Sequence, residues 1–552
     1  MKKRIALGLA ALVLALTACN SNSSQVSTQP DKSPAPSITP TNPVLTGAVT
    51  ELSLADDGIT VNGVPAGEEI SAVYISRDII YYEDRDTYDS GNLYGEGESH
   101  QRHSAQEAKS HLVVNITQPG NYRLKGNLSQ GQIRIDLGED AREDPKAVVN
   151  LVLEGVDITC TVAPAVLFRN VYECDASRTT ENASPMVDTT AAGANLILAG
   201  GSENVIHGSH VAKIYKDQEG EKKLWKQDGA IYSYMSMNVS GTGRLDLYAD
   251  NEGLDTELHL TVNGGDIRIL SDNDGINTHE DGVSVTTING GDLRILAGLG
   301  EEGDGIDSNG YLVINGGTVV AMAHPAADAG LDSDLGSYIH GGTVVALGSA
   351  MDWAESDSGQ VTMNLQFAQQ ISGCISVEKE DGTAVFAYNP DYDPLTAAKQ
   401  RSYSGMILSC SDFQQGDSYQ VYLDRSFDGN HQDGIYLVDS VTAYAGGIQQ
   451  AYTGTDVRMH PGMGGGFGGG PRPEGKEHSE MPPDGERPEL PEDRMPGGEP
   501  PEMPDGQHPN FPGSPGTDHK DFSIPPNGEM NSLFYMQDQV NFFTGLQPYT
   551  AE

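Results

Sequence analysis

The chain has 552 residues and a formal net charge of −46 at pH 7, with 79 Asp and Glu against 33 Lys and Arg. Nucleic-acid binding requires a basic surface, so this charge excludes nucleic acid as a partner. Such acidity either keeps a secreted protein soluble or marks clustered carboxylates that divalent cations neutralise.

The N-terminal residues 1–19 have the pattern of a secretory signal. A basic start at residues 2–4 precedes a short apolar run, residues 5–16. That run is too short for a membrane-spanning helix, which needs about 20 apolar residues. The ending Leu16-Thr17-Ala18-Cys19 resembles the lipobox of bacterial lipoproteins, which implies cleavage before Cys19 and a lipid on its sulfur. Residues 20–46 are then a flexible tether, and the protein is expected on the outer side of the cell membrane.

Two short phrases recur along the middle of the chain and interleave. The first phrase is Asn263-Gly264-Gly265-Asp266, Asn289-Gly290-Gly291-Asp292, Asn315-Gly316-Gly317-Thr318 and His340-Gly341-Gly342-Thr343. The second phrase is Gly253-Leu254-Asp255-Thr256, Gly275-Ile276-Asn277-Thr278, Gly305-Ile306-Asp307-Ser308 and Gly330-Leu331-Asp332-Ser333. Successive copies lie 22 to 30 residues apart, which is the signature of a repeat architecture.

The runs between the glycines alternate apolar and polar residues, which predicts strands with one face inward. Each repeat holds three short strands, and a single repeat has nothing against which to bury its apolar side. Stacked repeats solve this problem, so we expect an all-β chain built as a right-handed parallel β-helix over residues 120–350. The glycine pairs supply corners with positive φ. Residues 149–153, 194–198 and 229–233 are expected to be divergent rungs.

The flanking segments are predicted from composition. Residues 47–119 are a β-rich region with an insert, and residues 351–455 are a β-rich cap. Residues 456–531 are rich in Gly, Pro and Glu and predict disorder. Residues 532–552 turn apolar again, which indicates docking either on the body or on a partner.

Stacking places the aspartates of the second phrase above one another, about 4.8 Å apart, in one exposed column. Aligned carboxylates repel, and calcium, which takes six to eight oxygen ligands, would remove that cost. The alternative is that Asp and Asn serve the turns. The candidate metal ligands are Asp250, Asp255, Asp274, Asn277, Asp304, Asp307, Asp328 and Asp332.

A second outward column holds Arg268 and Arg294 beside Asp266 and Asp292. These residues form either an ordinary surface ladder of ion pairs or a carbohydrate-binding row that captures the carboxylates of an acidic sugar polymer.

The cysteines leave two alternatives open. Disulfides 160–174 and 374–410 are consistent with an extracellular protein, and so are free buried thiols at Cys160, Cys174, Cys374 and Cys410.

Residues 120–440 resemble a family of bacterial secreted carbohydrate-binding proteins with a pectate-lyase-like parallel β-helix. The resemblance rests on several phrases, among them Gly120-Asn121-Tyr122-Arg123-Leu124-Lys125-Gly126, Asp228-Gly229-Ala230-Ile231-Tyr232-Ser233 and Asp304-Gly305-Ile306-Asp307-Ser308-Asn309-Gly310. It implies binding of polygalacturonate or plant-wall polysaccharide with calcium between rungs. It also implies Asp274, Asn277, Asp304 and Asp307 as ligands, while Asp255 and Asp332 match the motif less fully.

Three functions follow from this reading. A polysaccharide lyase needs a base beside the calcium, and within residues 250–349 the only Arg or Lys residues are Arg268 and Arg294, on a different strand from the aspartates. No catalytic residue is therefore assigned, His207 and His210 are read as ordinary loop residues, and binding is favoured over catalysis. An envelope scaffold without a sugar ligand is the third alternative.

Overall fold

The structure is a computed structural model that describes residues 43–82, 94–96, 102–215, 225–395, 401–441, 443–455 and 530–550. The predicted signal, Cys19, most of the tether and residues 456–529 lie outside the described residues, so those predictions remain predictions. The described chain is all-β, as expected. Its one α-helix, α1 (Ala105–Ser110), is short, and no helix in the described ranges is long and apolar enough to cross a membrane.

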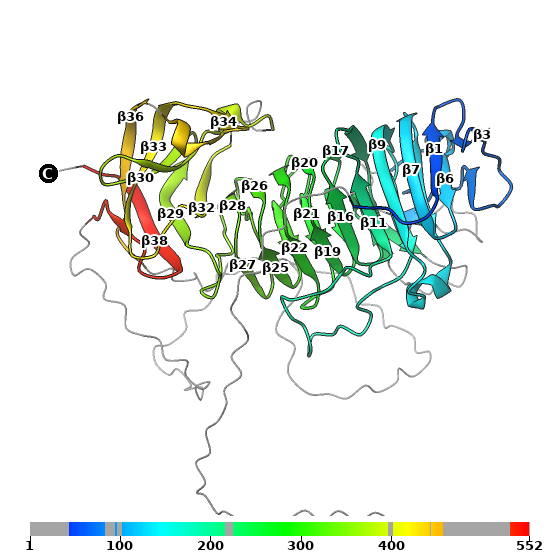
Figure 1. The fold of residues 1–552 in the computed structure, drawn as a ribbon, viewed down its shortest axis with the longest axis horizontal. Helices are drawn as coiled ribbons and strands as arrows, with labels where there is room; N and C mark the ends of the chain where they lie inside the picture. The colour runs from blue at the N-terminus through cyan, green and yellow to red at the C-terminus, as the bar shows by residue number, and fades with distance from the viewer. Residues whose placement is uncertain are drawn as a thin grey trace, which may run out of the picture.

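Three ladders of parallel strands run along the body of the molecule (Figure 1). The first ladder is β1 (Val49–Leu54), β7 (Gly120–Leu128), β9 (Val149–Thr159), β11 (Ala194–Leu198), β16 (Met237–Gly241), β19 (His259–Val262), β22 (Val285–Ile288), β25 (Tyr311–Ile314) and β27 (Gly336–Ile339). The second is the end of β9, then β12 (Glu203–Gly208), β17 (Arg244–Ala249), β20 (Asp266–Ser271), β23 (Asp292–Leu296), β26 (Thr318–Met322) and β28 (Thr343–Gly348). The third is β6 (Leu112–Ile116), β8 (Gly131–Asp136), β10 (Val166–Asn170), β15 (Gly229–Ser233), β18 (Glu252–Thr256), β21 (Ile276–Thr278) and β24 (Ile306–Ser308).

Successive repeats add one strand to each ladder, and equivalent residues pair in register; the last repeat reaches the third ladder only through the isolated bridge between Ile306 and Leu331. The second glycine of the phrase turns the corner: Gly291, Gly317 and Gly342 have φ of 100°, 85° and 92°. A Cβ on Gly317 would lie 2.6 Å from the carbonyl oxygen of Gly291 in the preceding repeat, so the stack leaves no space for a side chain there. An asparagine ladder reinforces the register, because the side-chain amide of Asn315 donates to that of Asn289 at 2.9 Å.

The C-terminal domain is an antiparallel continuation of the large sheet, so that sheet is mixed rather than parallel throughout. It comprises β29 (Thr362–Ile371), β30 (Ile375–Lys379), β31 (Ala384–Tyr388), β32 (Tyr403–Ser409), β33 (Ser418–Asp428), β34 (His431–Gln432), β35 (Ile435–Tyr436) and β36 (Ala443–Ala451). It joins the body where β28 pairs with β32 in antiparallel fashion.

The apolar C-terminal segment packs on this domain, which decides between the two docking alternatives. In Figure 1, β38 (Val540–Pro548) is the red strand beside β29, with which it pairs in parallel. β37 (Phe534–Tyr535) pairs with β33. Phe534 and Phe543 are buried in the core of the domain.

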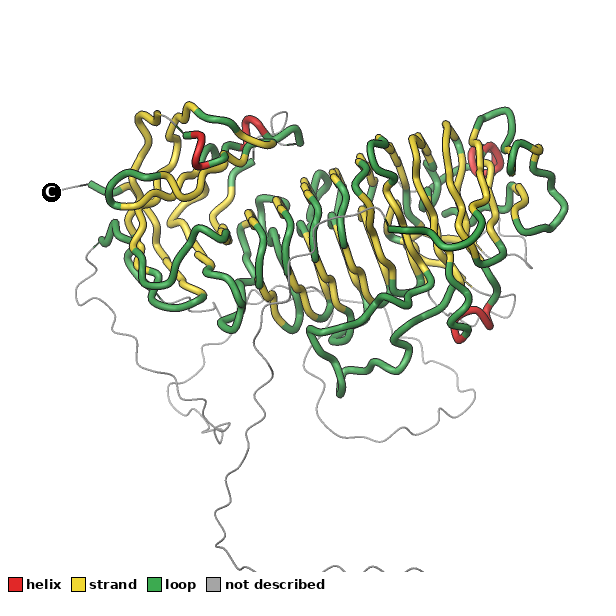
Figure 2. The backbone as a smooth tube through the Cα atoms, in the orientation of Figure 1, coloured by secondary structure: helices red, strands yellow, loops and turns green. Residues whose placement is uncertain are grey.

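At the N-terminal end, β2 (Thr60–Val61) and β3 (Val64–Pro65) form a small antiparallel extension of β1, and β4 (Val73–Ser76) pairs with β6. A separate antiparallel sheet of β5 (Tyr94–Glu96), β13 (Val211–Tyr215) and β14 (Trp225–Gln227) is inserted beside the ladders. Loops connect these short strands on the outside of the stack (Figure 2).

The four cysteines of the described chain are free, so the disulfide alternative is not realised. Cys160, Cys374 and Cys410 are buried, and burial raises the pKa of the Cys160 thiol to about 12. These thiols therefore act as small apolar groups.

Replacing Phe543 with Ala should destabilise the C-terminal domain by about 3–5 kcal/mol, because a fully packed aromatic ring leaves a cavity. Tyr535→Ala is the matched control, since Tyr535 lies on the neighbouring short strand and is 51% exposed. That change should stay within about 0.5 kcal/mol. Denaturant unfolding of both variants makes the comparison, and equal stabilities would contradict the docked position of β38.

Candidate metal and carbohydrate site

In-register stacking brings the acidic residues of the second phrase together along the third ladder. Asp255 pairs with Asn277, Asn277 pairs with Asp307, and the bridge between Ile306 and Leu331 places Asp332 next in line. A second column lies alongside, because the amide of Gly253 donates to the carbonyl of Asp274 and that of Gly275 to the carbonyl of Asp304. We call the two columns together the carboxylate face: Glu252, Asp255, Asp274, Asn277, Asp304, Asp307 and Asp332.

The carboxylate face is not the exposed column that the sequence predicts. Glu252 and Asp255 are 4% and 0% exposed, and Asn277 is 5% exposed. Asp304, Asp307 and Asp332 are half-buried, so the face becomes more accessible toward the C-terminal repeats. The buried end is covered by side chains from outside the repeat phrases, Lys226 on β14 and His279 after β21.

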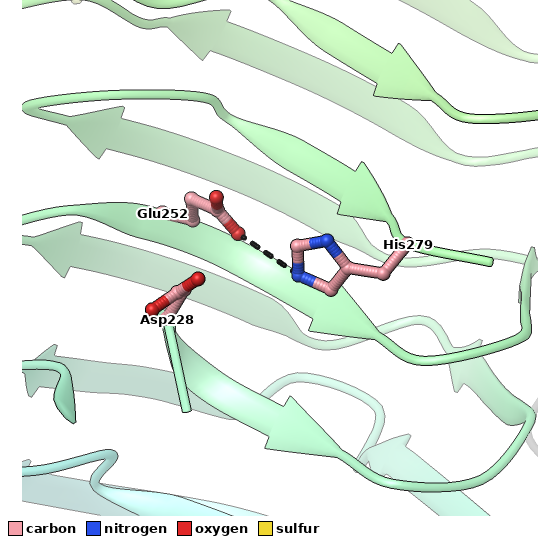
Figure 3. A group of neighbouring side chains, drawn as sticks. All are labelled: Asp228, Glu252 and His279. Carbon is pink, nitrogen blue, oxygen red and sulfur yellow. Dashed lines mark ion pairs between the residues drawn. The ribbon is translucent and has the colours of Figure 1, made fainter. Parts of the chain in front are cut away.

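Three residues that sequence reasoning did not assign meet at this buried end (Figure 3). One ligand atom from each of Asp228, Glu252 and His279 lies within 4.8 Å of the others. Lys226 Nζ lies 3.1 Å from Asp228 Oδ2 and 2.7 Å from His279 Nδ1. Asp228 directly precedes a divergent copy of the second phrase, residues 229–233. That copy is the sequence feature from which Asp228 could have been predicted as a site residue. Lys226 and His279 come from segments without a repeat.

The contact with Lys226 determines the tautomer of His279. An ammonium group has only donors, so Nδ1 accepts its proton and the neutral ring carries hydrogen on Nε2. Nε2 lies 2.8 Å from Asp255 Oδ1 and 3.6 Å from Glu252 Oε2. Nε2 therefore faces the two carboxylates at these distances without forming a hydrogen bond. In this arrangement its Nε2 has no lone pair for a metal ion.

Several oxygen atoms of the face are buried without a hydrogen-bond partner among the described residues. They are Glu252 Oε2, both carboxylate oxygens of Asp255 and Asn277 Oδ1. The close approach of Asp255 to His279 lacks hydrogen-bond geometry. Unpaired buried oxygens are costly, and carboxylate and amide oxygens are the ligands that calcium and magnesium prefer. The donor set of the face thus fits a hard divalent cation.

The turn alternative also has support, at two positions. Asp274 Oδ1 accepts a hydrogen bond from the amide of Asp304 at 2.7 Å, and Asp304 Oδ1 accepts from the amide of Ala329 at 2.5 Å. One oxygen of each carboxylate therefore links its repeat to the next. A structural role and a ligand role are compatible here, because each carboxylate has two oxygens.

Burial dominates the acid–base behaviour of the face. It raises the pKa values of Glu252, Asp255, Asp274 and Asp304 well above their ordinary range, and neighbouring carboxylates add to the shift. The pKa of Asp307 rises to about 8, through burial first and then through Asp274 and Asp332. With its pKa at about 8, the Asp307 carboxyl holds a proton at neutral pH when no cation is bound.

The remaining predicted ligands lie at the edge of the face or away from it. Asp328 accepts a hydrogen bond from the amide of Gly303 at 3.1 Å, and its charge contributes to the raised pKa of Asp304. Asp250 is exposed and contacts Ser209 and His210 instead, so the structure does not bring it to the face. His207, read as a loop residue, lies in β12 and stacks on Tyr248.

Residues of the C-terminal domain bind both of the predicted carbohydrate-binding arginines. The prediction of an exposed ladder is wrong at Arg294. Arg294 is 1% exposed and donates to Asp393 at 2.9 Å and to the carbonyl of Asp433 at 2.6 Å. Arg268 pairs with Asp433 at 2.9 Å. Arg268 also pairs with Asp266, and Arg294 with Asp292, as the ladder alternative expects. Asp393 and Asp433 lie 99 to 165 residues away, at positions that no repeat pattern indicates. Both arginines connect the ladders to the domain.

Comparison with known proteins agrees with a carbohydrate-binding class for the central part of the chain. A family model described as carbohydrate-binding domain-containing protein matches residues 110–384. A carbohydrate-binding domain-containing protein of Acetivibrio thermocellus is 29% identical over 161 residues, which are 29% of this chain and 46% of that relative, so the match spans about half of the relative's length. A solved structure of a polysaccharide lyase-like protein from C. thermocellum, a gadolinium derivative, has 21% identity and a TM-score of 0.33, and covers 53% of this chain and 93% of that one.

Replacing Arg294 with Met should destabilise the protein by about 3–5 kcal/mol, because Asp393 would remain buried without its partner. Arg244→Met is the matched control: Arg244 lies on β17 and its pair with Asp246 is about one third exposed on the arginine side. The control should cost less than about 1 kcal/mol. Similar losses in the two variants, measured by denaturant unfolding, would contradict the docking role of Arg294.

Proposed function

We propose that this protein binds polysaccharide outside the cell, through divalent cations held on the carboxylate face. The observation that carries the proposal is the stacking of Asp274, Asn277, Asp304 and Asp307 without a cationic partner among the described residues, with the buried Asn277 Oδ1 left without a hydrogen bond. The face lies inside residues 110–384, the part of the chain that matches the carbohydrate-binding family. In this proposal the three ladders wind as a right-handed parallel β-helix, which supplies the stacking that aligns the ligands.

The proposed cation is calcium. Calcium accepts carboxylate and amide oxygens in flexible geometry with six to eight ligands. That flexibility suits the carboxylate face, which offers seven such side chains in two columns. The proposed ligands are Asp274, Asn277, Asp304 and Asp307, with Asp255, Asp332 and Asp328 beside them. Lys226 supplies the positive charge at the buried end, so the cations belong to the more open repeats.

The proposed polysaccharide is acidic, such as polygalacturonate in plant-wall pectin. A polyuronate and this face carry the same charge and repel each other directly. A calcium ion bound at Asp304 and Asp307 would keep part of its coordination sphere for a sugar carboxylate. Calcium-dependent retention of an acidic polymer follows from that geometry. Signal cleavage and a lipid on Cys19 would hold the binder at the membrane, with the Ser-, Thr- and Pro-rich tether extending it outward.

A lyase is the second candidate, because Lys226 places a basic side chain beside the carboxylates, where none was expected. Asp228, Glu252 and Asp255 raise the pKa of Lys226 against the opposing effect of burial, so the amine stays protonated. A protonated amine is a poor general base, which favours binding over proton abstraction. A scaffold without a sugar ligand remains the third candidate.

The double variant Asp304→Asn with Asp307→Asn should lose calcium-dependent retention on polygalacturonate while keeping its β-sheet circular dichroism. It should also lose most of the thermal stabilisation by calcium, which amounts to about 2.7 kcal/mol at a hundredfold excess over the dissociation constant. The matched control is Asp57→Asn with Asp140→Asn, which removes two exposed charges elsewhere. The control should behave as wild type in both assays.

An equal calcium response in the double variant and the wild type would refute the metal ligands. Calcium binding without retention on polygalacturonate would refute the acidic ligand and favour the scaffold. Appearance of unsaturated uronide absorbance with wild type, lost on Lys226→Met, would replace the binder by a lyase.

A further inference from the structure

A series of aromatic side chains in ring-to-ring contact crosses the C-terminal domain, on β33, β34, β35 and β36 and in the segment before residue 393. Figure 1 labels three of these strands, β33, β34 and β36. Tyr392 stacks on His431 at 4.5 Å between ring centroids, and His431 lies 5.4 Å from Tyr436. Tyr436 lies 5.1 Å from Phe427, which lies 6.2 Å from Tyr444. We call Tyr392, His431, Tyr436, Phe427, Tyr444 and Tyr422 the aromatic strip.

Arg425 completes the strip by joining its last two rings. Its guanidinium carbon lies 4.7 Å from the ring centre of Tyr444 and 4.0 Å from that of Tyr422. Gly446, the residue opposite Arg425 on β36, has no side chain to cover it. The irregular position Asp424, with φ of 53°, changes the alternation of β33, so that Tyr422 and Arg425 share a face although they are three residues apart.

Much of the strip is open to solvent. Tyr392 is 51% exposed, His431 is exposed, and Tyr422, Phe427 and Tyr444 are half-buried, while Tyr436, which links His431 to Phe427, is buried. Rings of this size normally contribute to a core or an interface, because they remove a large apolar area from water. The core beneath is filled by other residues, including Tyr419, Val421 and Leu423 on the opposite face of β33.

The charge around the aromatic strip distinguishes between anionic and uncharged polymers as its ligand. The buried carboxylate of Glu378 binds Arg425 through contacts of 2.6 and 2.9 Å, so the guanidinium charge is already compensated. Exposed carboxylates adjoin the strip in the chain, at Asp391, Asp428 and Asp439. An anionic polymer would be repelled here. An uncharged polymer with apolar ring faces and hydroxyl edges fits both the rings and the tyrosine hydroxyls.

We infer that the aromatic strip is a second glycan-binding site, specific for uncharged polysaccharide and independent of metal. The row of rings suits an extended chain of pyranose units, whose C–H faces pack on aromatic rings. The strip lies beyond residue 384, outside the part of the chain that matches the carbohydrate-binding family. Only the choice of a sugar as ligand rests on the proposed function, because neither the carboxylate face nor calcium takes part.

The test uses the full chain, with a chelator present, in native gels that contain hydroxyethyl cellulose, xyloglucan or galactomannan. Wild type should be retarded by at least one of these polymers. Tyr392→Ala with His431→Ala, and separately Tyr444→Ala, should weaken that affinity by about twofold to twelvefold for each ring removed. Tyr535→Ala, also an exposed tyrosine of this domain, should leave the retardation unchanged.

Each outcome decides the inference. Absence of retardation in all three gels, or retardation equal in the strip variants and the control, overturns it. A strip variant that melts at the wild-type temperature and loses retardation supports the inference. A variant that melts at a lower temperature is replaced by Tyr392→Phe, which keeps the ring and should keep most of the affinity. Loss of a wild-type dimer in the strip variants, seen by sedimentation without any glycan effect, assigns the strip to a second copy. Retention on polygalacturonate with calcium is read separately, so failure of the carboxylate face and failure of the strip are distinguishable.

Discussion

In-register stacking of short parallel strands is the constraint on which the structure depends. Equivalent residues of successive repeats lie directly above one another, so each position of the repeat becomes a column along the molecule. Apolar columns, such as Ile276 on Ile306, fill the interior at no electrostatic cost. Glycine columns allow the corners, and in the asparagine column each side-chain amide donates a hydrogen bond to the one in the preceding repeat. The same geometry forces the acidic positions into two neighbouring columns, where carboxylates such as Asp274, Asp304 and Asp307 lie close to others of the same charge.

The negative charge of the carboxylate face is compensated differently at its two ends. At the buried end, Lys226 and His279 lie against Asp228, Glu252 and Asp255, and the insert that carries β14 supplies the compensating charge. Farther along, Asp274, Asp304 and Asp307 form no ion pair with a cationic side chain among the described residues, and their carboxyl groups have raised pKa values. Protons or bound cations are the two ways to neutralise them. In this account a site where calcium displaces protons, at Asp304 and Asp307, would lie beside a site where Lys226 provides the positive charge.

The repeat phrases contained enough information to predict the strands, the glycine corners and the alignment of Asp255, Asn277 and Asp307, because all three depend on local periodicity. They held no information about what covers the columns. Lys226 and His279 belong to segments without periodicity, so the burial of the face was missed. Arg294 looks like a surface residue in its own strand, and it is buried by Asp393, about a hundred residues along the chain. Similarly, the docking of β38 follows from apolar residues whose partner surface the sequence does not identify.

Proton release on calcium binding tests the central claim most directly. Burial raises the pKa of Asp307 to about 8, so this carboxyl holds protons at pH 7 in the metal-free protein, and these protons must leave when calcium takes its oxygens. Calorimetric titration of calcium into chelator-treated protein, in two buffers with different heats of ionisation, counts them. The account predicts saturable binding with net proton release at pH 7 that declines as the pH rises above 8. Calcium heats that are independent of the buffer, or no binding at all, would contradict it.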